Sequence, residues 1–222
     1  MKHLKKFSTA NEYDAFVASS QFVKPNVSYI VDDGSIHYHR NTSIYIQHTN
    51  GNLYTTEQWT AEGFTNDDAK GIAVIAAETQ FLITKFSSTN LSWGADGVID
   101  GIVVTTDSSV AKTDYKGKSN TQLMLNAGSA AGNAAFTCNY FELADGQRGY
   151  LPSLGELYIA YENRVAINEA RSLIGLAAIT SQIWSSTQYS ADMAWAINWS
   201  TGGIINGSRG SNKWRIYAFA EV

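Results

Sequence analysis

Four short runs near the start of the chain alternate apolar and polar side chains with a period of two. Such alternation is typical of half-buried β-strands. Between paired runs stand Asp-Gly and Asn-Gly, dipeptides that tolerate the positive φ of tight hairpin turns. The pattern therefore predicts two β-hairpins. The first joins residues 27–31 and 35–39 through Asp33-Gly34, and the second joins residues 43–48 and 52–56 through Asn50-Gly51.

A short helix is expected ahead of these hairpins. Thr9-Ala-Asn-Glu12 has the spacing of a capping box, and three apolar residues follow at i, i+3 and i+4, which predicts an amphipathic helix to about residue 20. We therefore divide the chain into a small N-terminal module, residues 1–50, and a larger domain, residues 51–222. The module combines one helix with hairpin strands.

The middle of the chain mixes apolar runs with helical spacing. Residues 71–86 are predicted to form one or two buried strands around a turn. Ser153-Leu-Gly-Glu156 is a second capping box, and apolar residues continue from it at i, i+3, i+4 and i+7, which predicts an amphipathic helix. Three further helices are expected: over residues 121–127 with Ser119 or Asn120 as N-cap, over residues 134–143, and over residues 167–175, ended by Gly175.

The last segment is predicted to be β-structure. In residues 195–200 bulky side chains alternate with small ones, so Trp195, Ile197 and Trp199 are expected to face the core and the other face to be nearly bare. Thr201-Gly202-Gly203 provides a turn, and residues 213–222 a final strand. Strands, then helices, then strands give an α+β arrangement rather than alternating βαβ units.

The composition favours a binding protein. Charged residues make up 16% of the chain, below the roughly 25% of an average soluble domain, so Ser, Thr, Asn, Gln and Gly must form most of the surface. Such surfaces resemble the adaptable binding sites of antibodies. The net charge of −4 argues against nucleic-acid binding. The single cysteine excludes an intramolecular disulfide. We expect no signal peptide and no membrane-spanning segment.

Motifs of enzymes and metal sites are weak or missing. No nucleophile elbow, phosphate-binding loop, dinucleotide fingerprint or zinc-protease motif occurs. His37 and His39 share one side of a predicted strand, but no nearby carboxylate or thiol completes a metal site. Asp96 and Asp100 lack the spaced oxygen ligands of a calcium loop. We therefore expect no metal and no cofactor.

Candidate catalytic groups are equally poor. Cys138 lies in an Ala/Phe-rich helix without a His to activate it, which favours a buried structural thiol over a nucleophile. Glu156 and Glu162 are six residues apart on one predicted helix, and capping already explains Glu156. The sequence thus favours a protein without enzymatic activity.

The segment 184–214 carries the sharpest functional signal. It contains four of the chain's 6 Trp, interleaved with small and polar residues. One reading is a rigid, aromatic-backed scaffold that displays a ligand-binding surface, because function often resides on loops held by a rigid frame. The other reading is an ordinary hairpin with a glycine-rich loop. The physical pattern alone leaves both open.

Several motifs in the larger domain resemble C-type-lectin-like domains of bacteria and their phages. WSSTQYS (184–190), AWAINWSTG (194–202) and WRIYAF (214–219) resemble the C-terminal signature of that family. GYLPSLGELYIAYEN (149–163) resembles its second helix, and KGIAVIAAETQFLIT (70–84) its opening strands. The resemblance covers roughly residues 52–222 and implies a C-type-lectin-like fold. The N-terminal module resembles small modules of phage and prophage tail proteins.

Some members of this family are the variable proteins of diversity-generating retroelements, which rewrite adenines at the 3′ end of a target gene. The resemblance implies a phage tail or bacterial surface adhesin, located on the virion or the cell surface. Its partner would be a host-cell surface receptor, protein or glycan, together with other virion tail proteins. An oligomer is compatible with the sequence, which shows no heptads.

The resemblance also implies a division of the C-terminal segment into displayed and supporting residues. Its supporting frame would be Trp184, Ser185, Ser186, Trp195, Trp199, Gly202 and Arg215. The candidate variable, ligand-binding positions are Asp192, Met193, Ala196, Asn198, Gly203, Ile205, Asn206, Gly207, Ser208, Gly210, Ser211, Asn212 and Trp214.

The chain departs from the family in two respects. The Glu-Pro-Asn, Gln-Pro-Asp and Trp-Asn-Asp motifs of calcium-dependent sugar-binding lectins are missing, as are the disulfides of the animal lectins. Calcium-mediated sugar binding by that route is therefore not expected. Two alternatives to a ligand-binding protein stay open: a structural tail component, and an enzyme on the similar scaffold of formylglycine-generating enzymes.

Overall fold

The computed structural model describes residues 5–7, 28–31, 36–38, 42–94 and 97–222. The chain divides into two compact units, one of residues 1–43 and 76–78 and the other of residues 44–75 and 79–222. The second predicted hairpin therefore belongs almost wholly to the larger unit, whereas the sequence places its first strand in the N-terminal module.

The smaller unit holds a three-stranded sheet. Strand β1 (Lys5–Phe7) pairs in parallel with β2 (Ser28–Val31), which pairs antiparallel with β3 (Ile36–Tyr38). The β2–β3 pair confirms the first predicted hairpin. The helix expected after Thr9 lies outside the described residues, as do the turn at Asp33-Gly34 and His39.

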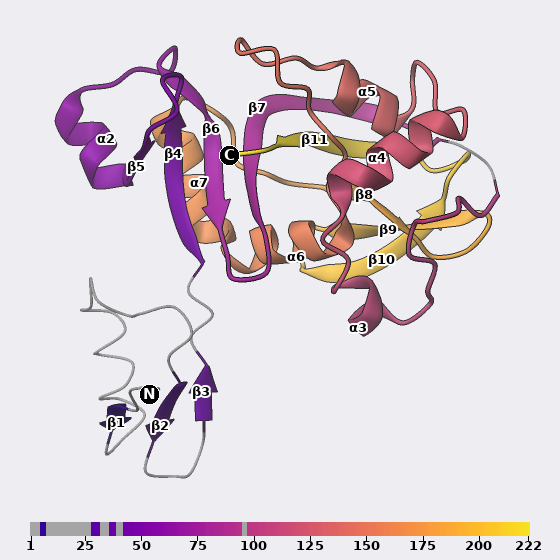
Figure 1. Cartoon of the computed structure of the whole chain (residues 1–222), viewed down its shortest axis with the longest axis horizontal. Coiled ribbons are helices and arrows are strands. Elements are labelled where there is room, and N and C mark those ends of the chain that lie inside the picture. The colour runs from indigo at the N-terminus through magenta and orange to yellow at the C-terminus, as the bar shows by residue number, and fades with distance from the viewer. Residues whose placement is uncertain (1–4, 8–27, 32–35, 39–41, 95–96) are drawn as a thin grey trace. The chain divides into compact units, whose positions relative to one another are not determined.

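The larger unit is built on an eight-stranded sheet with the order β10-β9-β8-β11-β7-β6-β4-β5 (Figure 1). Its last strand in sequence, β11, lies between β8 and β7, in parallel with β8 and antiparallel to β7. The C-terminal strand therefore joins the two halves of the sheet, because β8 and β7 are each paired with β11. The strands are β4 (Ser43–His48), β5 (Leu53–Tyr54), β6 (Ala69–Ile75), β7 (Gln80–Leu91), β8 (Gln182–Gln188), β9 (Met193–Asn198), β10 (Gly203–Ser208) and β11 (Trp214–Ala220).

Helices cover both faces of the C-terminal half of this sheet. Met124 and Cys138, from α4 and α5, pack with Trp184 and Ala196 on one face. Leu154, from α6, packs with Trp195 on the other. The mixture of one mostly antiparallel sheet with separate helices confirms the α+β class. The helices are α2 (Thr56–Glu62), α3 (Ser108–Ala111), α4 (Gly117–Asn126), α5 (Ala134–Tyr140), α6 (Leu154–Glu162) and α7 (Arg164–Leu173).

Local sequence signals account for some helix ends, with side-chain caps at the starts of α2, α3 and α6. The capping box predicted at Ser153 and Glu156 is present at the start of α6. The predicted cap of α4 is wrong, because Lys116 holds the N-cap position and neither Ser119 nor Asn120 does. Asn120 instead lies inside the helix, where its side chain donates to Asp114 Oδ2 at 2.9 Å. Asn120 therefore satisfies the buried carboxylate of Asp114 and does not cap the helix.

Candidate functional site

Strand β9 of the β9–β10 hairpin is buried on both faces, whereas β10 is mostly half-buried. On one face Trp195 packs with Leu154 of α6 and with Ile204 of β10. On the other face Ala194 and Ala196 are fully buried with Trp184. The expectation of a nearly bare face opposite Trp195 is therefore wrong. The side chains there are small because tryptophans lie over them.

Gly207 shows how closely those tryptophans pack. A Cβ on this residue would lie 2.8 Å from Cζ3 of Trp214 and 3.0 Å from Cη2 of Trp184. The two indoles are themselves in contact, with ring centroids 4.2 Å apart. Trp214 is thus half-buried against Trp184 and Gly207, and it supports the hairpin as well as bordering its surface.

The structure separates the candidate ligand-binding positions into three groups by exposure. Ala196 and Gly207 are buried, so neither is displayed. Asp192, Gly210 and Ser211 are exposed, and all three lie in the two loops at one end of the hairpin. The half-buried positions are Met193, Asn198, Gly203, Ile205, Asn206, Ser208, Asn212 and Trp214.

Arg209 fixes these two loops to a third segment. This side chain is 2% exposed, yet it was not among the residues singled out from the sequence. Its guanidinium donates to the carbonyl of Gly97 at 2.6 Å and to the carbonyl of Ala191, and it lies over the Trp93 ring at 4.8 Å. One buried cation therefore links the loop before β9, the loop after β10 and the segment that begins at Gly97.

Further hydrogen bonds hold the loop after β10 in one conformation. The Arg209 backbone N–H donates to the carbonyl of Asp192 at 3.1 Å, and the Ser208 N–H donates to Asn212 Oδ1 at 2.7 Å. Asn212 thus shapes the loop from within. Ser211 and Gly210 are left on its outside, on a backbone that is tied down at both ends.

The residues expected to form the frame are buried and hydrogen-bonded, apart from Gly202 and Arg215, which are half-buried. Trp184 Nε1 donates to the carbonyl of Leu91 at 2.9 Å, and Ser185 Oγ to the carbonyl of Trp195 at 2.8 Å. Trp199 packs edge-on against Tyr161 with centroids 5.6 Å apart. These contacts connect β8 to β7 and β9, and the end of β9 to α6.

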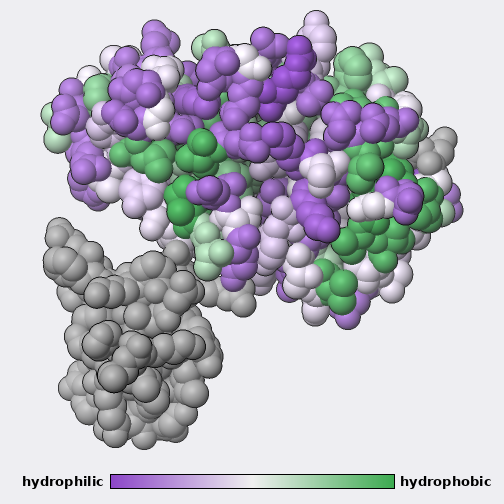
Figure 2. Space-filling model, in the orientation of Figure 1, coloured by the Kyte–Doolittle hydropathy of each residue, from purple (hydrophilic) through white to green (hydrophobic). Residues whose placement is uncertain are grey.

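Beside the hairpin lies an exposed apolar area. Figure 2 shows hydrophobic residues gathered on one face of the larger unit, at the end that carries β9 and β10. In the segment that begins at Gly97, Val98 and Val104 are 62% and 40% exposed. The segment that carries them is tied to Gln188 of β8, whose Oε1 accepts from the Ile99 N–H at 2.9 Å. Exposed apolar patches are a common mark of an interaction surface.

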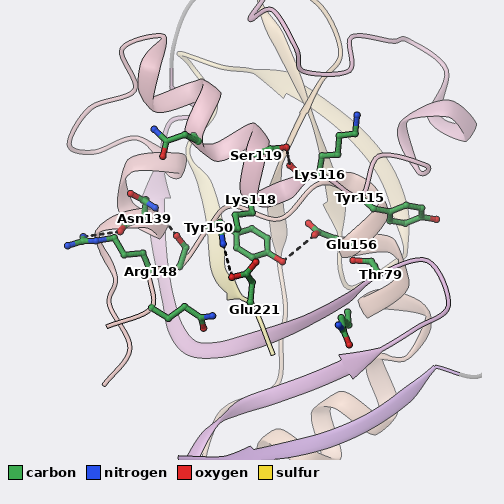
Figure 3. Close-up of a pocket in the computed structure, with 14 residues that line it drawn as sticks. Thr79, Tyr115, Lys116, Lys118, Ser119, Asn139, Arg148, Tyr150, Glu156 and Glu221 are labelled. Carbon is green, nitrogen blue, oxygen red and sulfur yellow. Dashed lines mark hydrogen bonds and ion pairs between the residues drawn. The ribbon is translucent and has the colours of Figure 1, made fainter. Parts of the chain in front are cut away.

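Elsewhere in the larger unit a hollow of about 880 Å³ lies between the start of α4, the segment before α6 and the C-terminus. Figure 3 shows the Tyr150 hydroxyl pointing at the carboxylate of Glu156, to which it donates at 3.2 Å. At its rim Lys118 forms an ion pair with Glu221 at 2.7 Å. Most of the residues that line the hollow have polar side chains, among them several amides and hydroxyls, although much of the exposed lining is apolar carbon.

Burial governs the chemistry of Glu156. The loss of water around it raises the pKa of this carboxyl to about 7, helped by the nearby charge of Asp114 and opposed by hydrogen bonds from Ser153 and Tyr150. Ser153 donates to Glu156 Oε2 through its N–H at 2.8 Å and through its hydroxyl at 3.0 Å. The carboxyl thus caps α6, as predicted, and also forms the floor of the hollow.

Cys138 takes part in no candidate site, and the side chains of His37, His39 and Asp96 lie outside the described part of the structure. Cys138 is fully buried, and burial raises the pKa of its thiol well above the usual value. Within the described ranges no three His, Cys, Asp or Glu side chains come together as metal ligands. No helix in the part of the chain that the structure describes is long and apolar enough to cross a membrane.

Comparisons with known proteins leave the family open. No family model matches the chain, and no curated protein matches it. Among solved structures, a fimbrial protein from Bacteroides ovatus is similar with a TM-score of 0.44 and 13% sequence identity. The match covers 87% of this chain and 52% of the fimbrial protein, so the chain spans about half of that protein's length. A likeness at this level does not assign a fold family.

Proposed function

We propose that the chain is a non-enzymatic receptor-binding protein with a C-type-lectin-like larger domain. Its ligand surface would consist of the loops on either side of the β9–β10 hairpin, with Asp192, Gly210 and Ser211 outermost. The observation that carries the proposal is Arg209, because one buried cation holds three segments together beneath small, exposed side chains. Rigid support under exchangeable residues is what a variable binding surface requires.

The apolar neighbours complete this surface. Small polar side chains offer hydrogen bonds but little area, whereas binding energy usually comes from a few larger buried groups. Val98 and Val104 lie exposed on the segment that Arg209 and Gln188 fix beside the loops. We infer that a receptor covers these valines and forms hydrogen bonds with the polar loop residues around them.

Diversification by a retroelement is part of the same proposal. The exposed loop positions have no core contacts to lose, so substitutions there leave the fold intact, whereas Gly207 and Ala196 are enclosed by tryptophans. We therefore restrict the variable set to the exposed and half-buried positions of the hairpin and its flanking loops. The protein would work as a phage tail component or a bacterial surface adhesin.

The alternative of an enzyme on the same scaffold has less support. A thiol nucleophile must reach its thiolate form and meet a substrate. Cys138 is fully buried, and its pKa is raised by burial. A structural tail component is the other alternative, and it would use the same surface to contact a neighbouring protein.

A triple variant separates receptor binding from a structural role. Asp192→Ala, Asn206→Ala and Ser211→Ala together remove polar side chains from the surface without touching Arg209 or the tryptophans. We expect attachment to receptor-bearing cells to fall at least tenfold while assembly into the parent particle and the unfolding temperature stay unchanged. A control triple of Thr113→Ala, Glu142→Ala and Glu169→Ala changes exposed residues elsewhere. Lost assembly with retained attachment would support the structural role instead.

A further inference from the structure

A separate pocket of about 350 Å³ opens where three strands of the sheet end. It is lined by Thr89 and Asn90 near the end of β7, Ser181 and Gln182 at the start of β8, and residues 213–215 at the start of β11. Its volume falls within the roughly 300–1,000 Å³ of small-ligand sites. Only Trp214 belongs also to the hairpin surface described above, so the pocket is a second site that the proposed function does not include.

The lining of this pocket is cationic. Lys213 and Arg215 both border it, and no carboxylate does. Within the described ranges neither cation forms an ion pair, and the buried Nε of Arg215 has no hydrogen-bond partner. A carboxylate suits these two unpaired cations well, because the planar guanidinium of Arg215 matches the two oxygens of that group.

The backbone around the pocket is strained. Asn90 and Ser181 have φ angles of 66° and 77°, and among the described residues they are the two non-glycine positions with positive φ. Such conformations persist only where the surrounding structure enforces them, and they cluster at ligand sites. At Ser181 the carbonyl accepts from the Trp199 N–H at 2.9 Å. Both strained residues line the same pocket.

The other groups in the lining indicate which kind of ligand would bear the carboxylate. Thr89, Asn90 and Gln182 supply a hydroxyl and two amides, which pair with hydroxyl groups, and Trp214 supplies an apolar indole. Strand β11 is already paired with β7 and β8, so an extended peptide finds no open strand edge here. We propose that this pocket binds a carboxylated sugar residue, with the carboxylate on Arg215 and Lys213 and the ring hydroxyls on the amides.

Titration of the whole chain with methyl β-D-glucuronide tests the proposal, with binding followed by NMR or calorimetry. We expect saturable binding that weakens with ionic strength, no comparable binding of the neutral methyl β-D-glucoside, and weaker binding of acetate. Arg215→Gln should weaken binding roughly tenfold or more, because it removes a charged hydrogen bond. Lys213→Gln should weaken it roughly threefold to tenfold, because this cation is exposed.

Lys116→Gln is the matched control, since it removes one exposed cation that borders the other hollow. Its binding should equal that of the unchanged chain. Equal loss in Lys116→Gln and Lys213→Gln would mean that net charge alone acts, which overturns the site. Equal binding of acetate and glucuronide, or tighter binding of an acidic dipeptide, would overturn the assignment of a carboxylated sugar as the ligand. Lys213→Gln keeps the test valid if Arg215→Gln fails to fold.

Discussion

At the scale of single residues, the interleaving of tryptophan with small side chains near the C-terminus has a packing explanation. Gly207, Ala194 and Ala196 are small because Trp184 and Trp214 occupy the space above them. The alternation therefore reports a tightly filled layer and not a displayed face. Displayed residues lie in the loops, where no tryptophan covers them.

Gly207→Ala tests this packing. The added methyl group would overlap the Trp214 ring, and overpacking of a core typically costs about 1–3 kcal/mol. We expect a loss of that size in the free energy of unfolding, measured by denaturant titration. Gly210→Ala is the control, since nothing lies within 4 Å of its added Cβ, and it should change stability by less than about 0.5 kcal/mol. Equal effects of the two changes would contradict the packing account.

Glu156 is expected to make the stability of the fold depend on pH. Its pKa rises from 4.5 in the unfolded chain to about 7 in the fold, so the folded state retains a proton that the unfolded state releases. The stability that Glu156 contributes is thus fully present below pH 4.5 and is lost as the pH rises towards 7. At about 1.4 kcal/mol per pKa unit, the loss is about 3 kcal/mol.

Glu156→Gln should remove this component. We expect the stability difference between the unchanged chain and the variant to shift by about 3 kcal/mol in favour of the variant between pH 4.5 and pH 7.5. Urea titrations at several pH values measure it. Glu169→Gln, an exposed glutamate on α7, serves as the control and should not produce this shift. A pH-independent difference for Glu156→Gln would mean that the carboxyl ionises normally.

At the scale of elements, local signals in the sequence predict helices and hairpins well. The Ser153–Glu156 capping box and the hairpin at Asn50-Gly51 both involve neighbours in the chain, and both are present. Helix α2 was missed although Thr55 and Gln58 form the same kind of box at its start. That signal was readable, but the alternating residues before it suggested a continuing strand.

Loop structure was not predictable in the same way. Arg209 donates to carbonyl groups 112 and 18 residues away in the chain. No local spacing in the sequence predicts partners so far away. A lone arginine in a loop rich in Gly and Ser would be expected to be exposed. The burial of both faces of β9 was missed for the same reason, because α4, α5 and α6 cover it from distant parts of the sequence.

Arg209→Met tests the loop clamp. The change removes the charged hydrogen bonds from Arg209 to the carbonyls of Ala191 and Gly97, of which the Gly97 carbonyl keeps a second donor in Gln188 Nε2 at 3.1 Å. Loss of a hydrogen bond to a charged group costs about 1.5–3 kcal/mol. We expect faster amide hydrogen exchange in residues 97–100 and 189–193, measured by mass spectrometry, together with lower stability. Arg148→Met removes an exposed arginine that pairs with Glu142 and should cost at most about 1 kcal/mol. Unchanged exchange in both segments would show that Arg209 does not hold them.

At the scale of the whole molecule, the C-terminal strand limits what can vary. Strand β11 lies inside the sheet, and its residues from Ile216 to Ala220 are buried. A process that rewrites the 3′ end of the gene must therefore change the loop codons and spare those of residues 216–220. The fold permits this because the loops precede the buried strand and are held by Arg209.

The central claim, that these loops form a diversified receptor-binding surface, is tested most directly by sequencing the DNA around the gene and many copies of its 3′ end. We expect a reverse-transcriptase gene and a near-copy of the segment that differs mainly at adenines. Changes among the copies should fall on Asp192, Gly210, Ser211 and their half-buried neighbours, and should spare Arg209, Gly207 and Ile216. A neighbourhood without the near-copy, or changes spread evenly over buried and exposed codons, would contradict the account.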